Sequence, residues 1–377
     1  MKKILLVATV QSHICQFHKP LVKMLHEHGC EVHVAARNNL AEKNGLKLDF
    51  VEKVYDLPFE RSPFSKRNLV AYKQLKTIID AGNYDVVHTN TPVGGIAGRL
   101  AARNARKKGC QVFYTAHGFH FFKGGPKKNW LVYYPIEKFM CRFTDELITI
   151  TEEDYDLAKR EFSVSVSHIH GIGANAEKYG VPTDEEVAVL RHELCIAPDR
   201  KVVICTGELN ANKNQITALH AMKQVVEQMP EALLLLAGNG PTHDELQTAI
   251  AELGLGEHAV LLGYHTDLER YVKASDLILS CSKREGLPLN IIEGQLCKKP
   301  VVASVNRGHK ELIRNNENGY LLDALDIDGF AEKIAELLKD PRLAAAFAEA
   351  GLCNAQRYTA ASVKNELEEI YGKRNIV

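Results

Sequence analysis

Short runs of consecutive apolar residues alternate along the chain with longer segments in which apolar residues recur at helical spacing. Strands buried on both faces of a parallel sheet have such continuous runs, and parallel strands need helical crossovers between them. The pattern therefore predicts an α/β fold of doubly wound parallel sheets. The predicted strands are residues 4–10, 31–36, 85–88, 112–116, 147–151, 201–206, 232–237, 260–263, 277–280 and 301–304.

A glycine-rich stretch with Pro182 separates two such series of strands and helices. Thr183 and Glu186 follow it with the spacing of a capping box, which starts a new helix. The chain is therefore predicted to form two Rossmann-like domains, and its last segment is a helical pattern with no strand after it. The expected limits are residues 1–177 for the N-terminal domain, 178–359 for the C-terminal domain, and 360–377 for a final helix that packs back on the N-terminal domain.

Composition narrows the class of protein. The 377 residues contain 47 Lys plus Arg and 47 Asp plus Glu, so a uniformly basic protein and an unfolded acidic chain are both excluded. Nine scattered cysteines without metal-ligand spacing indicate reduced thiols in a cytoplasmic protein. No run approaches the roughly 18 apolar residues needed to cross a bilayer, so membrane contact should be peripheral.

The charges are unevenly distributed. Residues 1–180 carry 26 basic and 18 acidic side chains, and the remainder carries 21 and 29, so the halves have net charges of +8 and −8. Residues 99–144 contain ten cations, one acid and several aromatics, a mixture suited to an anionic inner-leaflet membrane surface. The alternative is a solvated face whose aromatics belong to the core. Nucleic acid is not expected, because no recognised binding module accompanies the cations. The predicted lipid-binding residues are Lys123, Lys127, Lys128 and Trp130.

The most specific motif follows the predicted strand 277–280. It reads Ser-Lys-Arg-Glu-Gly-Leu-Pro-Leu-Asn-Ile-Ile-Glu-Gly over residues 282–294, and its apolar spacing starts a helix near Pro288. Glu285 then lies in a loop at the carboxyl end of a parallel strand, where open α/β sheets bind ligands. Glu293 lies in the helix, whose free N–H groups favour a diphosphate. Carboxylates in this setting are placed to accept hydrogen bonds from sugar hydroxyls.

This motif, with the Gly238-Asn-Gly240-Pro turn and Lys213 after Gly207, resembles the family 4 retaining glycosyltransferases of GT-B fold. The first half resembles the EpsD-type enzymes of bacterial exopolysaccharide and capsule assembly. The segments that carry this second resemblance are residues 13–20, 88–95, 114–121 and 129–137. Together the two resemblances cover nearly the whole chain. They imply two Rossmann-like domains facing across a cleft.

The resemblance also implies roles for individual residues. Glu293 would hold the ribose hydroxyls, Glu285 would contact the donor sugar near the reacting carbon, and Lys213 would neutralise the departing diphosphate. His117 would reach the donor sugar from the N-terminal domain, and the loop of residues 11–18 would lie beside the acceptor. The further expected donor-binding residues are Gly207, Gly238, Gly240, Arg284, Gly286 and Leu287, and the expected acceptor-side residues are His13, His18, Gly94 and Gly95.

Each of these residues also has a structural interpretation. Glu285 and Lys213 could be solvated loop residues, His117 a core histidine, and the glycines ordinary turn or packing positions. The chain also departs from the family pattern, since Glu208 stands where an Arg commonly follows the glycine. Lys213 would then act alone, or Arg284 or Arg307 would replace the missing cation.

No cofactor or metal is expected. The pairs Asp154 and Asp156, and Asp326 and Asp328, match a metal-binding D-x-D pattern, but both precede helical segments and are interpreted as helix-start acids. The G-x-G-x-x-G fingerprint of NAD-binding proteins does not follow the first strand.

These observations predict a metal-independent, retaining glycosyltransferase that is cytoplasmic and peripherally attached to the inner membrane face. The resemblance implies a UDP-sugar donor and a polyprenyl-diphosphate-linked saccharide as acceptor. Three alternatives remain: a nucleotide-sugar epimerase of the same fold, a non-catalytic paralogue that serves as an assembly subunit, and a membrane-surface binding module.

Overall fold

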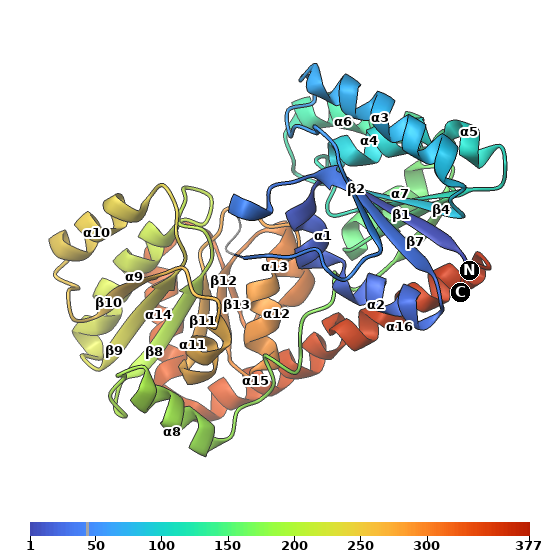
Figure 1. Ribbon diagram of the computed structural model, residues 1–377. Coiled ribbons are helices and arrows are strands. Elements are labelled where there is room, and N and C mark those ends of the chain that lie inside the picture. Colours follow the sequence, from blue (N-terminus) through green and yellow to red (C-terminus); the bar gives the residue numbers. More distant parts are fainter. Residues whose placement is uncertain (43–44) are drawn as a thin grey trace. The chain divides into compact units, whose positions relative to one another are not determined.

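The computed structural model describes residues 1–42 and 45–377. It divides into two compact units, Met1–Gly173 with Ala360–Val377, and Ala174–Thr359. We call them the N-terminal and C-terminal domains. Their first boundary lies four residues before the predicted limit at 177/178. The chain returns to the N-terminal domain at Ala360, which is the predicted start of the last helix. Each domain has a parallel sheet with helices on both faces (Figure 1).

The N-terminal sheet has seven strands in the order β3-β2-β1-β4-β5-β6-β7, all parallel. Its central strands are almost wholly buried, which explains their continuous apolar sequences. The strands are β1 Lys3–Val10, β2 Glu31–Arg37, β3 Lys53–Asp56, β4 Val86–Asn90, β5 Gln111–Ala116, β6 Glu146–Thr149 and β7 Ser165–His168. The helices are α1 Gln11–Phe17, α2 Lys19–Glu27, α3 Arg67–Gly82, α4 Pro92–Ala101, α5 Arg103–Arg106, α6 Lys127–Met140, α7 Glu152–Glu161 and α16 Ala360–Lys373, with short 3₁₀ turns η1 Leu40–Glu42 and η2 Cys141–Phe143.

The C-terminal sheet has six parallel strands in the order β10-β9-β8-β11-β12-β13. Apolar side chains from both of its faces pack under helices and form two core clusters. The strands are β8 Lys201–Thr206, β9 Ala232–Ala237, β10 Ala259–Gly263, β11 Leu277–Ser280, β12 Val301–Ser304 and β13 Tyr320–Leu322. The helices are α8 Asp184–Glu193, α9 Gln215–Gln228, α10 His243–Glu252, α11 Leu268–Ala274, α12 Leu289–Leu296, α13 Arg307–Leu312, α14 Ile327–Lys339 and α15 Pro341–Ala355, with the 3₁₀ turn η3 Gln356–Tyr358.

Local signals in the sequence position several helices. Thr183 and Glu186 form the predicted capping box of α8, with Glu186 N–H donating to Thr183 Oγ1 at 3.1 Å. Pro288 precedes α12 as its N-cap, as the apolar spacing predicted. The last helix, α16, packs within the N-terminal domain, where the Tyr371 hydroxyl hydrogen-bonds His88 Nδ1 at 2.7 Å.

Candidate active site

In both sheets the strand order reverses once, and ligands of open α/β sheets bind outside the carboxyl ends of the strands at that point. In the C-terminal domain the reversal lies between β8 and β11. The loop after β8 carries Gly207 and Lys213, and the loop after β11 carries Glu285. The topology therefore brings together residues that are about seventy positions apart in the sequence.

Lys213 and Glu285 form an ion pair at this point. The Lys213 ammonium lies 2.6 Å from Glu285 Oε1, and both side chains are largely buried. Asn210 orients the first loop, because its side-chain oxygen accepts the Lys213 N–H at 2.9 Å. Asn212 joins the two loops, since its carbonyl accepts the Lys283 N–H and its amide donates to the Arg284 carbonyl. A cation and a carboxylate are thus held at fixed positions beside the strand ends.

Glycines allow the neighbouring loops to approach each other closely. Gly207 and Gly238 have φ angles of +142° and +148°. A Cβ atom on Gly238 would lie 2.0 Å from the Gly207 carbonyl oxygen, and one on Gly240 would lie 2.1 Å from that of Leu209. These contacts are with backbone atoms, which cannot move aside as a side chain could. Packing therefore requires Gly238 and Gly240 whether or not they also touch a ligand.

Glu293 projects from α12, next to the segment that precedes α8. The Tyr179 hydroxyl hydrogen-bonds its carboxylate, and Lys178 lies close enough to stabilise its charge. Burial outweighs both effects and raises the pKa of Glu293 to about 7. The carboxyl group is therefore poised to gain or lose a proton near neutral pH.

The remaining predicted donor residues differ in exposure. Gly286 is exposed, and Leu287 is partly buried against the core. Arg284 is also exposed. Glu208, at the position of the family arginine, is exposed and accepts a hydrogen bond from Asn210 Nδ2 at 3.1 Å.

A third loop, of which the sequence analysis named only Arg307 as a possible replacement for the missing cation, supports Glu285. It follows β12, and a Cβ atom on its Gly308 would lie 2.4 Å from the Gly286 carbonyl oxygen and 2.9 Å from Glu285 Cβ. Asn306 caps α13 and donates to the Ser282 carbonyl at 2.8 Å. A strand end followed by Asn as an N-cap and then Gly is the signal that could have identified this loop.

The N-terminal domain presents three histidines at the corresponding edge of its sheet. His13 lies in α1, His18 precedes α2, and His117 follows β5, and one ring nitrogen of each lies within 4.8 Å of the others. His13 Nε2 is 3.2 Å from His117 Nε2, and His117 Nε2 is 3.2 Å from Asn90 Oδ1. Sequence positions more than a hundred residues apart are thus brought together. The resemblance implied that His13 and His18 lie on the acceptor side and that His117 reaches the donor sugar.

Burial keeps these imidazoles neutral. It lowers the pKa of His13 to about 4. It also holds the pKa values of His18 and His117 well below that of a free imidazole, with smaller contributions from their neighbouring histidines. His18 and His117 line a cavity of about 20 Å³, and His18 Nε2 has no hydrogen-bond partner within the described part of the chain. Three neutral imidazoles could bind saccharide hydroxyls or a transition metal.

Gly94 and Gly95 lie at the start of α4 and are buried. A Cβ atom on Gly94 would lie 3.0 Å from the Ala8 backbone, and one on Gly95 would lie 2.7 Å from the Tyr114 ring. Both residues therefore allow α4 to pack closely on the sheet. This close packing is the structural interpretation that the sequence left open for them.

The predicted lipid-binding residues surround the start of α6. Lys123, Lys127 and Lys128 are exposed. Trp130 is different, because its ring packs against Phe121 and its indole N–H donates to the Phe122 carbonyl at 3.1 Å. This partly buried position, packed against the core, does not suit an anchor that inserts into a bilayer, so the assignment of Trp130 to the lipid surface is corrected.

Three of the four acids of the two D-x-D pairs stand at helix starts, as predicted, and Asp156 is the fifth residue of α7. Asp326 is the N-cap of α14 and accepts the Gly329 N–H, and Asp154 lies in the first turn of α7. Within residues 1–42 and 45–377, no helix is both long and apolar enough to span a membrane.

Two doubly wound parallel domains define a GT-B fold, which solved structures share over nearly the whole chain. HepE of Anabaena, whose structures hold UDP, UDP with glucose, or UDP-glucose, superposes with a TM-score of up to 0.78 over 99% of this chain and 100% of that one, at about 21% identity. Sucrose-phosphate synthase of Thermosynechococcus elongatus gives a TM-score of 0.76 over 100% and 99% of the two chains, at 19% identity.

The sequence comparisons identify the family. "Glycosyl transferase 4-like" proteins match residues 3–151, and "Glycosyl transferases group 1" match residues 188–352. EpsD of Bacillus subtilis, which its name assigns to the glycosyltransferases, is 41% identical over 98% of this chain and 96% of its own. An Escherichia coli UDP-Gal:α-D-GlcNAc-diphosphoundecaprenol α-1,3-galactosyltransferase is 30% identical over 80% of both chains.

The chain belongs to the family 4 glycosyltransferases, a retaining family whose members use nucleotide-sugar donors. The resemblance stated from the sequence is thereby confirmed.

Proposed function

We propose that this enzyme transfers a sugar from a UDP-sugar to a polyprenyl-diphosphate-linked saccharide in exopolysaccharide or capsule assembly. The observation that carries the proposal is the pairing of Lys213 with Glu285 at the β8/β11 reversal, where a nucleotide-sugar would place its diphosphate and sugar. Support for the substrates comes from the E. coli relative, whose name gives a UDP-sugar donor and a diphosphoundecaprenol-linked acceptor.

The donor would use three side chains of the C-terminal domain. Glu293 would accept hydrogen bonds from the ribose hydroxyls, and Glu285 would face the sugar near its anomeric carbon. Lys213 would exchange its contact with Glu285 for the diphosphate, because a dianionic leaving group attracts an ammonium more strongly than one carboxylate does. The exposed part of the loop after β11, with Arg284 and Gly286, would close the phosphate side.

The transfer itself would need no side-chain base. The acceptor hydroxyl oxygen would bond to the anomeric carbon on the face from which UDP departs, while the bond from that carbon to the β-phosphate oxygen breaks. The hydroxyl proton would pass to the departing phosphate oxygen, so anomeric configuration is retained. Lys213 would stabilise the negative charge that develops on the phosphate.

His13 and His18 of the N-terminal domain would bind the acceptor, and His117 lies beside them. As neutral imidazoles they can exchange hydrogen bonds with hydroxyl groups without the desolvation cost of a buried cation. His18 Nε2 could do so directly, whereas His13 Nε2 would exchange its contact with His117. The role of His117 beside the donor sugar stays a prediction. Its substitution by Ala should lower turnover more than nucleotide affinity.

A UDP-release assay tests the proposal. Purified enzyme should release UDP from a nucleotide-sugar only when a polyprenyl-diphosphate-linked saccharide is present, and the product should retain anomeric configuration. Lys213→Met and Glu285→Gln should each lower turnover by about 10²–10³-fold. The same rate in EDTA is expected, because no metal is needed to hold the diphosphate. Lost activity that manganese restores would overturn this metal independence.

The outcomes also separate the alternatives. UDP-sugar binding without UDP release, with any lipid-linked saccharide, would make the protein a non-catalytic assembly subunit, an interpretation that Glu208 at the family arginine position favours. An epimerase would act on the nucleotide-sugar with no acceptor present.

A further inference from the structure

Helix α6 carries a stripe of apolar side chains on its solvent side. Leu131, Val132, Ile136 and Phe139 are 78%, 43%, 38% and 52% exposed. They lie at positions i, i+1, i+5 and i+8 and share one helix face, together with the exposed Pro135. A continuous exposed apolar face of this kind marks an interaction surface.

The opposite face of α6 already satisfies the core. Trp130, Tyr133 and Tyr134 pack against a buried cluster. Glu137 accepts two hydrogen bonds from Arg99, at 3.0 and 3.2 Å, and both side chains are buried. The exposed stripe is thus additional to the core packing. Glu137 is the only acidic residue in positions 99–144, and it is buried in its pair with Arg99. No acid from this segment is therefore available to neutralise its surface cations.

Cations stand at both ends of the stripe. Lys127 and Lys128 occupy the first turn of α6, which has no acidic residue, although the helix dipole favours acids there. Beyond the other end, the Arg142 guanidinium lies 5.6 Å from the centre of the Phe139 ring. Lys127 and Lys128 therefore work against the stability of α6, which indicates that they have a role outside the helix.

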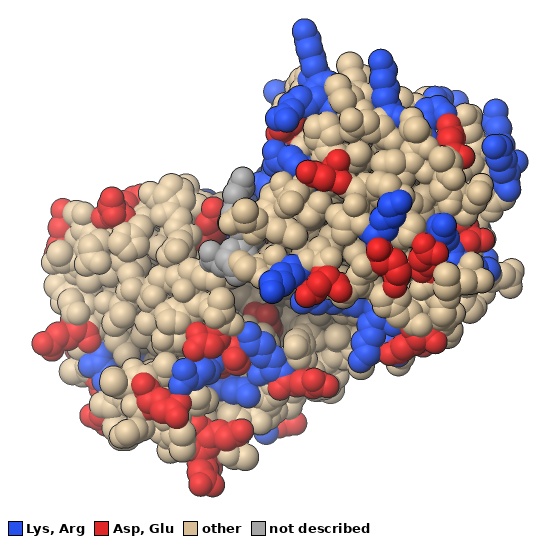
Figure 2. Space-filling model, viewed as in Figure 1, with Lys and Arg blue, Asp and Glu red and all other residues tan. Residues whose placement is uncertain are grey.

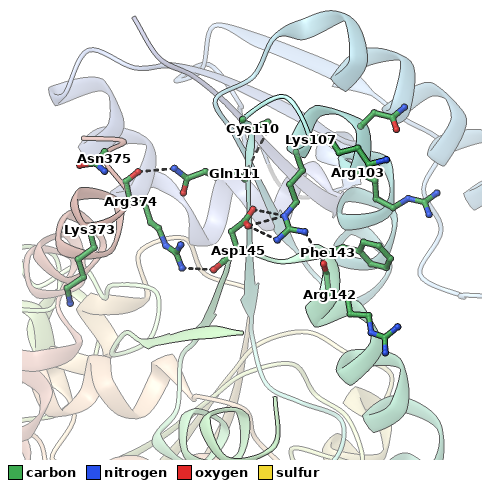
Figure 3. Close-up of a pocket in the computed structure, with 13 residues that line it drawn as sticks. Arg103, Lys107, Cys110, Gln111, Arg142, Phe143, Asp145, Lys373, Arg374 and Asn375 are labelled. Carbon is green, nitrogen blue, oxygen red and sulfur yellow. Dashed lines mark hydrogen bonds and ion pairs between the residues drawn. The ribbon is translucent and has the colours of Figure 1, made fainter. Parts of the chain in front are cut away.

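The end of α6 leads into a basic pocket of about 1000 Å³ (Figure 3). Its wall includes Phe143, which contacts Phe139 with ring centres 5.5 Å apart and so joins the pocket to the stripe. Within the described part of the chain, three of its cations form no ion pair, whereas Arg106 pairs with Asp145 and Arg374 with Glu146. The three unpaired cations are Arg103, Lys107 and Arg142.

This pocket is separate from the histidine cluster. It lies at the amino ends of β5 and β6, beside Gln111 and Asp145. His117 follows the carboxyl end of β5, and all strands of this sheet are parallel, so the two lie at opposite edges of it. A ligand in the pocket would not occupy the candidate acceptor site.

We propose that the α6 stripe and the basic pocket form one docking surface for an anionic bilayer. The stripe would enter the boundary between headgroups and acyl chains, and Arg103, Lys107 and Arg142 would bind phospholipid phosphates. Within residues 1–42 and 45–377, cations that form no ion pair flank the apolar face on both sides, which matches the layered chemistry of such a bilayer. The inference deepens the membrane attachment expected of the proposed function, and it replaces Trp130 by side chains that are free to insert.

Vesicle flotation of the full-length protein tests the surface. Vesicles of phosphatidylcholine alone are compared with vesicles that also contain phosphatidylglycerol. Wild-type protein should float with the anionic vesicles and be released as salt rises. Arg103→Gln/Lys107→Gln/Arg142→Gln should bind about 100-fold more weakly, since each cation contributes about fivefold. Leu131→Gln/Phe139→Gln should bind at least tenfold more weakly.

A matched control removes three exposed cations elsewhere. Lys310→Gln/Arg342→Gln/Arg357→Gln lies in the C-terminal domain and should bind within twofold of wild type. Binding of both surface variants at the level of this control would overturn the proposal, and so would equal binding to neutral and anionic vesicles. The single exchange Lys107→Glu, at an exposed position, provides the same test if a multiple variant does not fold.

Flotation requires neither donor nor acceptor, so its outcome is independent of the transferase assay. If the proposal holds, both surface variants should keep wild-type UDP release with a short-chain, water-soluble acceptor and lose it with acceptor in anionic vesicles. Lost turnover with the soluble acceptor would contradict a role confined to membrane docking.

Discussion

At the scale of single residues, Glu293 has a protonation state that should control nucleotide binding. Its pKa is raised to about 7 by burial, and a carboxylate that accepts two ribose hydroxyls must be ionised. Binding therefore requires loss of a proton below pH 7. We expect a UDP-sugar to bind about tenfold more weakly at pH 6 than at pH 8. Calorimetry in buffers of different ionisation enthalpy should show proton release at pH 6.

Glu293→Gln provides the control for this effect. The amide has nearly the same shape but does not titrate, so its affinity should be lower at pH 8 and independent of pH. A UDP-sugar has no phosphate monoester to titrate, so the donor itself does not contribute. The interpretation fails if the wild-type affinity is constant from pH 6 to 8.

Gly308 should position Glu285 through contact alone. A Cβ atom in Gly308→Ala would meet the Gly286 carbonyl oxygen at 2.4 Å, which forces the loop after β11 to move. We expect turnover to fall at least tenfold, because displacement of a reacting group by about 1 Å can cost two orders of magnitude. Steady-state UDP release measures this loss. Gly256→Ala is the control, since a Cβ atom there meets nothing within 4 Å, and wild-type turnover in both variants would contradict the role.

The sequence predicted the residues of this site unevenly. Glu285, Glu293 and Lys213 stand in a motif whose order along the chain matches a known family. Gly308 and Asn306 follow the neighbouring strand β12 and contact the loop after β11. Their role could not be predicted from the sequence, because it depends on which loops meet at the edge of the sheet. Trp130 looked like an interfacial aromatic because composition does not tell which face of a helix points inward.

At the scale of elements, burial decided which strands could be predicted. All ten predicted strands exist, and their limits differ from the observed ones by at most two residues. The three that were missed, β3, β7 and β13, lie at sheet edges. Edge strands are short and partly exposed, so they lack the continuous apolar run that identifies a central strand.

Helix α16 should stabilise the N-terminal domain through one buried hydrogen bond. Tyr371→Phe would leave His88 Nδ1 buried without its partner, which costs about 1–3 kcal/mol of unfolding free energy. Thermal denaturation followed by calorimetry measures the loss. Tyr264→Phe is the matched control, because that side chain is 56% exposed. An equal effect of the two exchanges would show that the buried hydrogen bond contributes nothing to the free energy of unfolding.

At the scale of the whole molecule, the zero net charge conceals two oppositely charged domains. The N-terminal domain carries 28 basic and 20 acidic side chains, and the C-terminal domain carries 19 and 27. Lys and Arg side chains project around α3 and α5 of the N-terminal domain (Figure 2). This difference suits a domain that meets an anionic membrane, and it leaves the donor domain to hold a diphosphate with a few placed cations.

Two domains with separate cores should also respond separately to their ligands. Each has its own hydrophobic clusters, so we expect two calorimetric transitions. A UDP-sugar at about 100 times its dissociation constant stabilises the unit that binds it by about 2.7 kcal/mol, which should raise one transition by roughly 5–10 °C. Tyr371→Phe identifies the other transition, because it weakens only the N-terminal domain. If the donor raised the transition that Tyr371→Phe lowers, the assignment of the donor to Lys213, Glu285 and Glu293 would be wrong.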